Sequence, residues 1–593
     1  MRKLILFIVS ILFSIQCYSQ NQKDSTKISI TQKALGEGLK LITRTGGDSV
    51  LVENSEDRFL PFEGKIIRNI YIESIGFEKS IYGNDKAITQ KIGRAANKLH
   101  TNTREKTIRQ HLFIHPNDLL NPYKLGDNER FLRNKDFILE SRFVITPIDN
   151  SDSVDVTIVT RDVFSIGLSA GGSFPSAPKF NLYDANLDGR AQRIEFNFLF
   201  DQDRKPKTGF GASFKKSSFL GSFADLEFFY TQLNSGFSYG DETEYATGII
   251  IDRQLVSPYS RMAGGVQLSK NWSRNVYSRP DSSFLDYSYN LVDLWAGYNF
   301  GAKKKIQDRN RAFLALRVFD GYYSRQPDLE GLIRNRIYNN ASGVLAAMTF
   351  YKRDFFKTQY VFGFGRTEDV PYGYSITPTF GLVRQLRTQR PYAAIKLEYN
   401  GAFSSGSFYD LEFNVSSYFR NSSLEDAVFT SNISYATKVF TIGRFKIRNS
   451  AMLNYTQLFN VFANDWLQID SSIIPGLRVE ELDASKRNSL GLQTIVFTPW
   501  SIIGFRIAPF TAVNWAMMKC STCEEKNNIY TGISAGMRIR NENLIFGTME
   551  LKATYIPNDE SGDSKFSFSF RQNLRFRKTD VFVTAPSLNR YNN

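Results

Sequence analysis

Histidine is scarce in this chain of 593 residues, which contains only 3. They are His100, His111 and His115, which lie close together in the sequence, and no histidine follows residue 115. A Ser-His hydrolase needs a histidine as its general base, and the rest of the chain has none to offer. Two segments, Gly167–Gly171 and Gly532–Gly536, match G-x-S-x-G. We interpret them as small residues alternating within strands, where they ease the close approach of another segment, and we expect no enzymatic activity.

Cysteine is equally scarce, with 3 in the whole chain. Cys17 lies in the apolar N-terminal stretch, and Cys520 and Cys523 form one isolated C-x-x-C motif. The motif is open to three interpretations: a redox pair, half of a zinc site or a small disulfide in an exposed loop. No second cysteine pair completes a zinc site. We therefore favour a Cys520–Cys523 disulfide and expect neither a metal site nor a cofactor.

Long apolar runs are absent after the first twenty residues. Arg2 and Lys3 precede the apolar stretch Leu4–Ile15, which is the pattern of a secretory signal peptide and is short for a transmembrane helix. Beyond it, no run of ~20 apolar residues predicts a membrane-spanning helix. The chain nevertheless contains 50 Phe and 29 Tyr, a combination that suits strands with one apolar face.

The formal net charge is +15, which by itself would suit a nucleic-acid partner. The basic residues are spread along the chain rather than concentrated in one run. The predicted signal peptide indicates an exported protein. Together with the even spread of charge, it favours basic residues in the polar lumen of a β-barrel and in contact with anionic lipid headgroups instead. We expect membrane lipid, and no nucleic acid, as a partner.

A small mixed domain is predicted ahead of the strand-rich region. Strand alternation occurs at Lys65–Ile72, and helical spacing at Asp85–Leu99. Further elements are expected as two helices followed by two strands, at Thr103–Leu112, Asn121–Arg133, Phe137–Ile148 and Val154–Val159.

From about Phe164 the pattern changes to recurring strands separated by Gly, Asn, Asp and Ser. In Arg193–Asp201, Phe196, Phe198 and Phe200 share one face and polar residues share the other. Aromatic-rich strands without a helical layer favour an antiparallel barrel with its apolar face toward lipid. The edges of a sheet in lipid must be paired, so closure is expected. We predict a mainly β chain: a transmembrane antiparallel β-barrel preceded by a small α+β domain.

The predicted organisation divides the chain into five parts. They are a signal peptide (1–20), a linker (21–58), the α+β domain (59–161), the barrel (162–577) and a C-terminal tail (578–593). The tail follows the closing strand Lys565–Arg577, and it either folds back into the periplasm or is disordered. At roughly 20–26 residues per strand and connection, the barrel region accommodates about 16–20 strands.

Several motifs resemble the BamA/TamA superfamily of outer-membrane barrels, the bacterial surface antigen family. The element order of the small domain resembles its POTRA module, concretely at Asn97–His100, Asn128–Arg133 and Thr160–Asp162. The segment Gly365–Gly373, with E-D-V-P-x-G, resembles one found in surface-antigen relatives. Pro475–Trp500 resembles the sixth extracellular loop and the following strand of the superfamily. The resemblance implies a barrel of about sixteen strands and a single POTRA-like domain.

The resemblance also implies a loop lock in the barrel lumen. In the superfamily, an L-R-G-aromatic loop folds into the lumen and its arginine is held by an acidic residue. Gly476 and Arg478 occupy the corresponding loop, whereas Val479 replaces the motif glycine. Asn514 stands where an aspartate is expected, and Gln493 where glutamate is frequent. The charge pair is therefore reduced to a charge–dipole contact.

The function implied by this resemblance is outer-membrane protein assembly or protein translocation. Its mechanism is non-covalent: the POTRA edge strand pairs with an incoming chain by β-augmentation, and the barrel seam opens or templates a strand. The implied partners are unfolded or nascent outer-membrane or secreted proteins and periplasmic or lipoprotein factors. The implied location is a Gram-negative-type outer membrane with the N-terminal domain in the periplasm. The alternative is a passive channel or surface receptor that uses the small domain as an adaptor.

Overall fold

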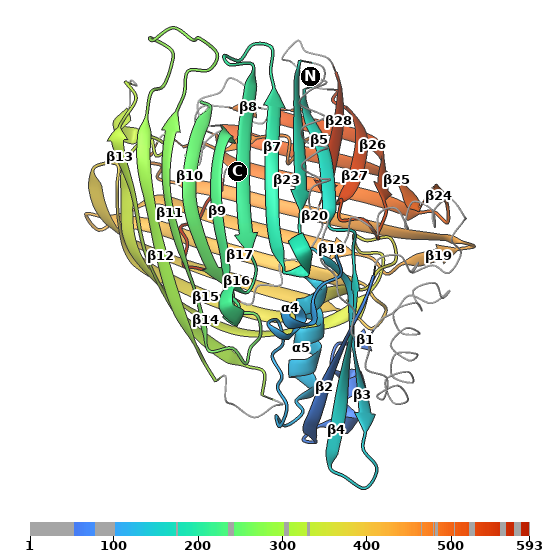
Figure 1. Cartoon of the computed structure of the whole chain (residues 1–593). Helices are drawn as coiled ribbons and strands as arrows, with labels where there is room; N and C mark the ends of the chain where they lie inside the picture. The colour runs from blue at the N-terminus through green and yellow to red at the C-terminus, as the bar shows by residue number, and fades with distance from the viewer. Residues whose placement is uncertain are drawn as a thin grey trace.

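The computed structural model describes most of the chain after residue 52. The described residues are 53–76, 101–173, 176–234, 242–301, 308–328, 332–463, 465–477, 479–480, 484–502, 504–520, 528–557, 565–574 and 583–591. They form a small α+β domain at one end of a large antiparallel barrel (Figure 1). No helix in these ranges is long and apolar enough to cross a membrane. The predicted signal peptide and the helix predicted at Asp85–Leu99 lie outside the described residues.

The small domain is a three-stranded sheet covered by helices. Its strand order is β2-β4-β3, with β2 parallel to β4 and β3 antiparallel to β4. The elements are β2 (Ile66–Ile75), α4 (Glu105–Arg109), α5 (Pro122–Arg133), β3 (Ile138–Pro147) and β4 (Ser153–Asp162). The predicted helix at Asn121–Arg133 and the two predicted strands after it are confirmed.

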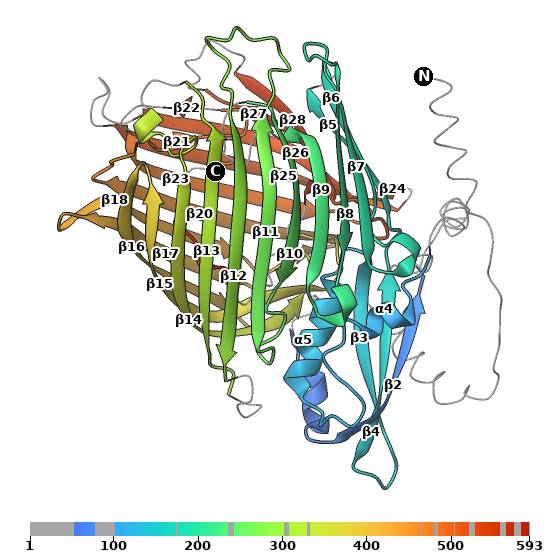
Figure 2. The ribbon, with the colours of Figure 1, turned by 60° about the vertical axis from the view of Figure 1, so that its left-hand side comes forward.

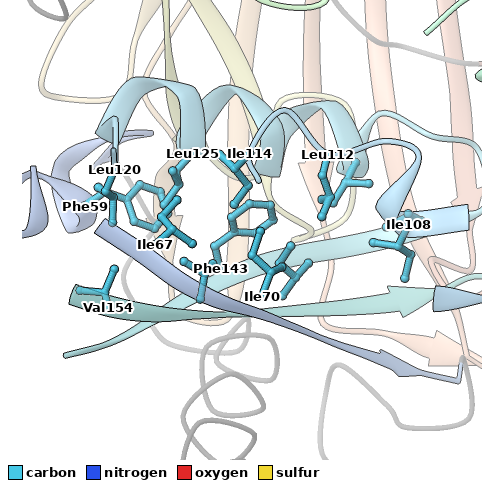
Figure 3. Packing of buried hydrophobic residues seen from close by; sticks show 14 of the residues in the cluster. Phe59, Ile67, Ile70, Ile108, Leu112, Ile114, Leu120, Leu125, Phe143 and Val154 are labelled. Atoms are coloured by element: carbon cyan, nitrogen blue, oxygen red, sulfur yellow. The ribbon is translucent and has the colours of Figure 1, made fainter. Parts of the chain in front are cut away.

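Helix α5 begins where its sequence favours a helix start. The side chain of Asn121 accepts a hydrogen bond from the backbone N–H of Lys124 at 3.1 Å, and Pro122 occupies the first helical position. Both features are typical of helix N-termini. The helix packs on the sheet through one apolar core, and Figure 3 shows side chains from the helices and the strands meeting there. Phe143 of β3 and Leu125 of α5 are fully or almost fully buried in this core.

Residues assigned to a linker by the sequence take part in the fold. The short strand β1 (Glu53–Asn54) pairs with barrel strand β14. The 3-10 helix η1 (Asp57–Phe62) follows, and its Phe59 is buried in the core of the small domain. The segment therefore connects the barrel, through β1, to the small domain, through Phe59. Burial of the bulky apolar side chain of Phe59 stabilises this connection.

The main sheet contains 23 strands, of which β1, β19 (Phe440–Ile442) and β24 (Ser501–Ile502) are only two or three residues long. The other twenty form a nearly closed barrel in which the ladder runs from β5 to β28 and β28 lies beside β5. These strands are β5 (Ile166–Ser173), β6 (Ala177–Asp184), β7 (Gln192–Phe200), β8 (Thr208–Lys216), β9 (Asp225–Asn234), β10 (Glu244–Arg253), β11 (Met262–Ser273), β12 (Ser288–Phe300), β13 (Arg311–Arg325), β14 (Ala341–Thr358), β15 (Glu368–Gln385), β16 (Thr388–Ala402), β17 (Phe408–Arg420), β18 (Ser423–Ala436), β20 (Phe445–Phe459), β23 (Ala484–Phe497), β25 (Phe505–Cys520), β26 (Asn528–Arg540), β27 (Thr548–Tyr555) and β28 (Phe566–Leu574).

The strand count corrects the expectation of about sixteen strands. Twenty strands lie at the upper end of the range allowed by the length of the region, whereas sixteen was taken from the family resemblance alone. The barrel portions of β5 to β9 are only 8–10 residues long. Short strands joined by short turns fit more crossings into the same length of chain.

The predicted alternation between an apolar outer face and a polar inner face is confirmed. On β13, Leu314, Leu316 and Val318 are exposed on the outside of the barrel. The intervening Arg317 points inward and forms an ion pair of 2.6 Å with Asp293 of β12. An outer surface of exposed large apolar side chains around a polar interior is the pattern of a barrel in lipid.

The small domain lies at one mouth of the barrel, which we name the domain-side mouth (Figure 2). Alternate strand connections face it. Asp188 between β6 and β7 pairs with Arg104 at 2.5 Å, and Ser257 between β10 and β11 donates to Asp127 of α5 at 2.9 Å. The described residues of the long connection between β20 and β23 lie at the opposite end, the far mouth.

Candidate functional site

The connection between β20 and β23 folds against the inner wall of the barrel. We name its described residues 465–477 the lumenal loop. Leu467, Ile469 and Ile474 are completely buried, and they share an apolar cluster with Ala516 and Met518 on the inner face of β25. An apolar loop inside a polar lumen needs such a patch of wall, because leaving its side chains in water would forgo their burial.

Gly476 is fixed by close contact with the last barrel strand. Its φ of +90° is a backbone conformation that favours glycine. A Cβ at this position would lie 2.3 Å from the Cβ of Ser567 on β28. In the same region, a Cβ at Gly532 would lie 2.8 Å from the side chain of Ile474. The small residues of the Gly532–Gly536 segment thus leave room for the lumenal loop.

Two of the predicted lock residues lie on neighbouring strands of the inner wall. Asn514 of β25 is in register with Gly491 of β23, where a Cβ would lie 3.1 Å from its amide oxygen. Gln493 of β23 is in register with Ala512. Arg478 lies outside the described residues, so its contact with Asn514 stays a prediction.

Cys520, one of the two residues of the predicted Cys520–Cys523 disulfide, lies at the far mouth, and its pairing with Cys523 stays a prediction. Cys520 ends β25 and is disulfide-bonded, and Cys523 lies outside the described residues. Within the described ranges, no three His, Cys, Asp or Glu side chains are grouped to hold a metal ion.

A buried ionic network joins the small domain to the domain-side mouth. We name it the docking face and define it by Glu129 and Arg133 of α5 and by Lys357 and Asp369 of the barrel. Arg133 binds Asp369 through Nη2–Oδ1 at 2.7 Å and Nε–Oδ2 at 3.0 Å. Lys357 Nζ lies 2.6 Å from Glu129 Oε2, and both of these side chains are completely buried. Bidentate arginine–carboxylate pairing also fixes orientation.

The electrostatics of the docking face maintain its charges. Burial alone would raise the pKa of Glu129, but Lys357 and Arg58 outweigh it, and the pKa of this carboxyl is lowered. Burial would lower the pKa of Arg133, but the carboxylates of Asp369 and Glu140 raise it further above its usual range. Each charge is stable in the interior only while its partner is present.

The docking face accounts for the E-D-V-P-x-G segment. Glu368 accepts backbone hydrogen bonds from Val361 at 2.8 Å and from Phe362 and Gly363 at 2.9 Å, which orders the connection between β14 and β15. Asp369 receives Arg133 of the small domain. One carboxylate of the motif therefore shapes a turn at the mouth, and the next one binds the domain.

The outer edge of β3 is also engaged in this network. The backbone N–H of Phe143 donates to Glu129 Oε1 at 3.0 Å, and the carbonyl of Ser141 accepts from Arg133 at 3.0 Å. These backbone groups face away from β4, where a further strand would pair. The side chains that hold the domain on the barrel therefore also cap this edge.

The described part of the C-terminal tail, residues 583–591, lies inside the barrel. Val583 is buried against Phe313 and Tyr351 near the domain-side mouth. Tyr591 is buried with the lumenal loop, and its hydroxyl donates to the carbonyl of Asp465 at 3.0 Å. Figures 1 and 2 both place the C-terminal label within the outline of the barrel. The expectation of a periplasmic or disordered tail is wrong for these residues, because the inner wall provides both apolar contacts and hydrogen bonds for them.

Sequence reasoning missed both the docking face and the position of the tail. Arg133 and Asp369 are 236 positions apart, and such a pair leaves no local periodicity. The one available signal was the adjacent pair of carboxylates Glu368 and Asp369 after the glycine- and aromatic-containing segment Tyr360–Gly365.

Comparisons with known proteins do not establish a family for this chain. No family model matches it, and no curated protein matches it. Solved structures that align with it include BamA from Haemophilus ducreyi lacking POTRA domains 1-3, at 12% identity over 96% of this chain and 97% of that chain, with a TM-score of 0.32. CdiB from Acinetobacter baumannii aligns at 10% identity over 96% and 86% of the two chains, with a TM-score of 0.40. CdiB from Escherichia coli aligns at 9% identity over 96% of each chain, with a TM-score of 0.38.

Proposed function

We propose that this chain is an outer-membrane barrel that assembles or translocates other polypeptides by non-covalent means, using its N-terminal domain as a POTRA-like module. The observation that supports this proposal most strongly is the docking face. A pore for small solutes needs only its wall, whereas this barrel also holds an α+β domain at one mouth through Arg133–Asp369 and Lys357–Glu129. The domain carries a sheet edge suited to pair with another chain.

In this proposal, release of the domain from the barrel is coupled to client binding. Glu129 and Arg133 cap the β3 edge and hold the barrel at the same time. An incoming extended chain that pairs with β3 replaces these side chains on the backbone of Ser141 and Phe143. The domain then loosens from the mouth while it holds the client.

The barrel seam offers a second place for strand exchange. The side-chain amide of Gln572 on β28 donates to the carbonyl of Leu168 at 2.9 Å and accepts from the backbone N–H of Ala170 at 3.3 Å. A single side chain thus imitates the donor and acceptor of a peptide group beside β5. A client strand can take over these two bonds without any covalent step, and the proposal requires no cofactor.

The proposed setting is an outer membrane with the small domain in the periplasm. The exposed apolar outer face contacts lipid, and unfolded outer-membrane or secreted chains, with or without periplasmic or lipoprotein factors, contact the domain. Passive solute transport and a surface-receptor role are the competing functions.

Depletion of the protein in its native host tests the proposal. Quantitative proteomics of the outer membrane and the culture medium is expected to show that a defined set of outer-membrane or secreted proteins falls. Complementation with the Arg133→Ala variant should fail, and complementation with Arg68→Ala, which removes an exposed arginine side chain in the same domain, should succeed. An unchanged protein census combined with slower uptake of small solutes contradicts the proposal and favours the passive channel.

A further inference from the structure

The tail residues 583–591 cross the lumen from one mouth to the other. Val583 packs near the domain-side mouth with Phe313, and Tyr591 packs with the lumenal loop at the far mouth. An extended segment of nine residues spans about 25 Å. That length matches the roughly 25 Å apolar band of an outer-membrane barrel.

Besides the side-chain contacts of Val583, Asn589 and Tyr591, the inner wall binds the backbone of the tail. Arg317 of β13 donates to the carbonyl of Pro586 at 2.9 Å. The hydroxyl of Tyr392 on β16 accepts from the backbone N–H of Asn589 at 2.9 Å. Arg487 of β23 donates to the carbonyl of Tyr591 at 2.8 Å. Three wall side chains on three well-separated strands thus bind peptide groups, which every polypeptide possesses.

The exposure of the tail residues fits such a backbone-directed contact. Thr584, Ser587 and Arg590 are exposed, so every third side chain points away from the wall. A period of three is that of a polyproline II segment, which makes no internal backbone hydrogen bonds. Its peptide groups are therefore free of regular secondary structure and accessible to donors and acceptors of the wall.

We infer that Arg317, Tyr392 and Arg487 form a binding track for an extended polypeptide along the lumen, and that the tail occupies this track as an intramolecular ligand. The inference rests on the proposed function and specifies the ligand of the lumen: a client segment in extended conformation. The client and the tail compete for the same three contacts. Recognition through the backbone makes the track tolerant of client sequence.

The test uses the full-length protein and a variant truncated after residue 582. The probe is a fluorescent synthetic peptide of residues 581–593. The truncated barrel is expected to bind it, and the full-length barrel to bind it at least tenfold more weakly, because a tethered competitor acts at millimolar effective concentration. A peptide of the same composition in scrambled order should bind the truncated barrel within about fivefold of the native sequence, since a backbone bond contributes the same to either sequence.

A cycle of two changes tests the backbone contact itself. Tyr392→Phe removes the hydroxyl acceptor, and an ester in place of the amide between Leu588 and Asn589 of the peptide removes the N–H donor. Each change should weaken binding to the truncated barrel by about 2- to 10-fold, and both together by no more than either alone. Tyr455→Phe on β20, whose hydroxyl binds Gln457 away from the tail, is the matched control and should leave binding unchanged.

A full-length variant provides the second test should the truncated barrel fail to fold. Asn589→Pro removes the backbone N–H that Tyr392 accepts and so weakens only the tethered tail, and the native peptide should bind this variant more tightly than the parent. Equal binding to the parent, the truncated barrel and this variant overturns the inference. The inference is also overturned if the scrambled peptide does not bind while the ester peptide binds as tightly as the native one, because the tail is then a sequence-specific plug. Peptide binding needs no client, so an unchanged protein census after depletion would reject the proposed function and leave the track intact.

Discussion

The docking face and the tail track are two polar contacts of the same barrel wall, and they are built in opposite ways. On the docking face, side chains bind side chains, and Lys357 and Glu129 are fully buried partners whose charges depend on each other. On the track, single wall side chains bind backbone groups of a segment in which every third side chain is exposed. The first contact selects one partner and penalises its absence, whereas the second can exchange one polypeptide for another.

The largest expected effect is the loss of the docking pair. Asp369→Ala leaves Arg133 buried without its bidentate partner, and we expect docking to weaken by about 3–5 kcal/mol. Tryptic cleavage of residues 101–147 in the assembled protein should become much faster, while carboxypeptidase trimming of the tail stays unchanged. The double variant Arg133→Met, Asp369→Leu removes both charges and should restore much of the protection. Equal cleavage of the parent and Asp369→Ala would show that the docking face does not penalise the loss of a partner, which is the property that distinguishes it from the tail track.

A smaller effect is expected at the tail track, through the lumenal loop that supports the tail. Gly476→Ala introduces a Cβ that meets Ser567 and strains a left-handed backbone, at a cost of about 1–3 kcal/mol. Because the lumenal loop receives Tyr591, carboxypeptidase should trim the tail faster, and tryptic cleavage of the docked domain should not change. Ser567→Gly should relieve the clash but not the backbone strain, so the double variant is expected to recover in part. Full retention of the tail in Gly476→Ala would show that the loop does not support it.

Acid is expected to affect the small domain through one buried histidine. Nδ1 of His111 donates to the carbonyl of Thr107 at 2.7 Å, and burial lowers the pKa of His111 to about 3. A lowered pKa stabilises the folded domain fully above the ordinary value of about 6.5, and this stability is lost as the pH falls toward 3, by at most about 1.4 kcal/mol per pH unit.

The measurement is protection of residues 101–147 from proteolysis in urea at pH 7.5 and pH 5. The parent should lose more protection than His111→Gln, which keeps a donor for Thr107 and does not titrate in this range. The same loss in both proteins would place the acid sensitivity in the carboxylates of the docking face.

The smallest effect is expected at an ion pair of the same domain in which only the arginine is exposed. Arg68 lies 2.6 Å from Asp155, but its side chain is 52% exposed. Arg68→Ala should leave both tryptic cleavage and tail trimming close to the parent values, because water screens the exposed arginine and Asp155 keeps a hydrogen bond from Asn69 Nδ2 at 3.1 Å. A loss as large as that of Asp369→Ala would mean that burial does not distinguish strong ion pairs from weak ones in this protein.

The sequence was sufficient for features that repeat along the chain. The outward face of Phe196, Phe198 and Phe200 and the helix that starts at Asn121 both follow local rules of period and capping. The number of barrel strands could not be predicted in this way. A period of two identifies a strand, but it does not determine how many strands form the circumference of the barrel. Arg133 with Asp369, and Arg317 with Pro586, join residues more than 200 positions apart, and neither pair has a local signature.

The even number of barrel strands determines on which side of the barrel the tail ends. A barrel of twenty strands, an even number, returns the chain to the mouth at which it entered, so the small domain and the end of β28 share one side. The tail then makes one further passage without adding to the wall, and Tyr591 arrives at the far mouth. A label placed near Tyr591 would report on the opposite compartment from a label on the small domain, although an even strand count alone would assign both to the same one.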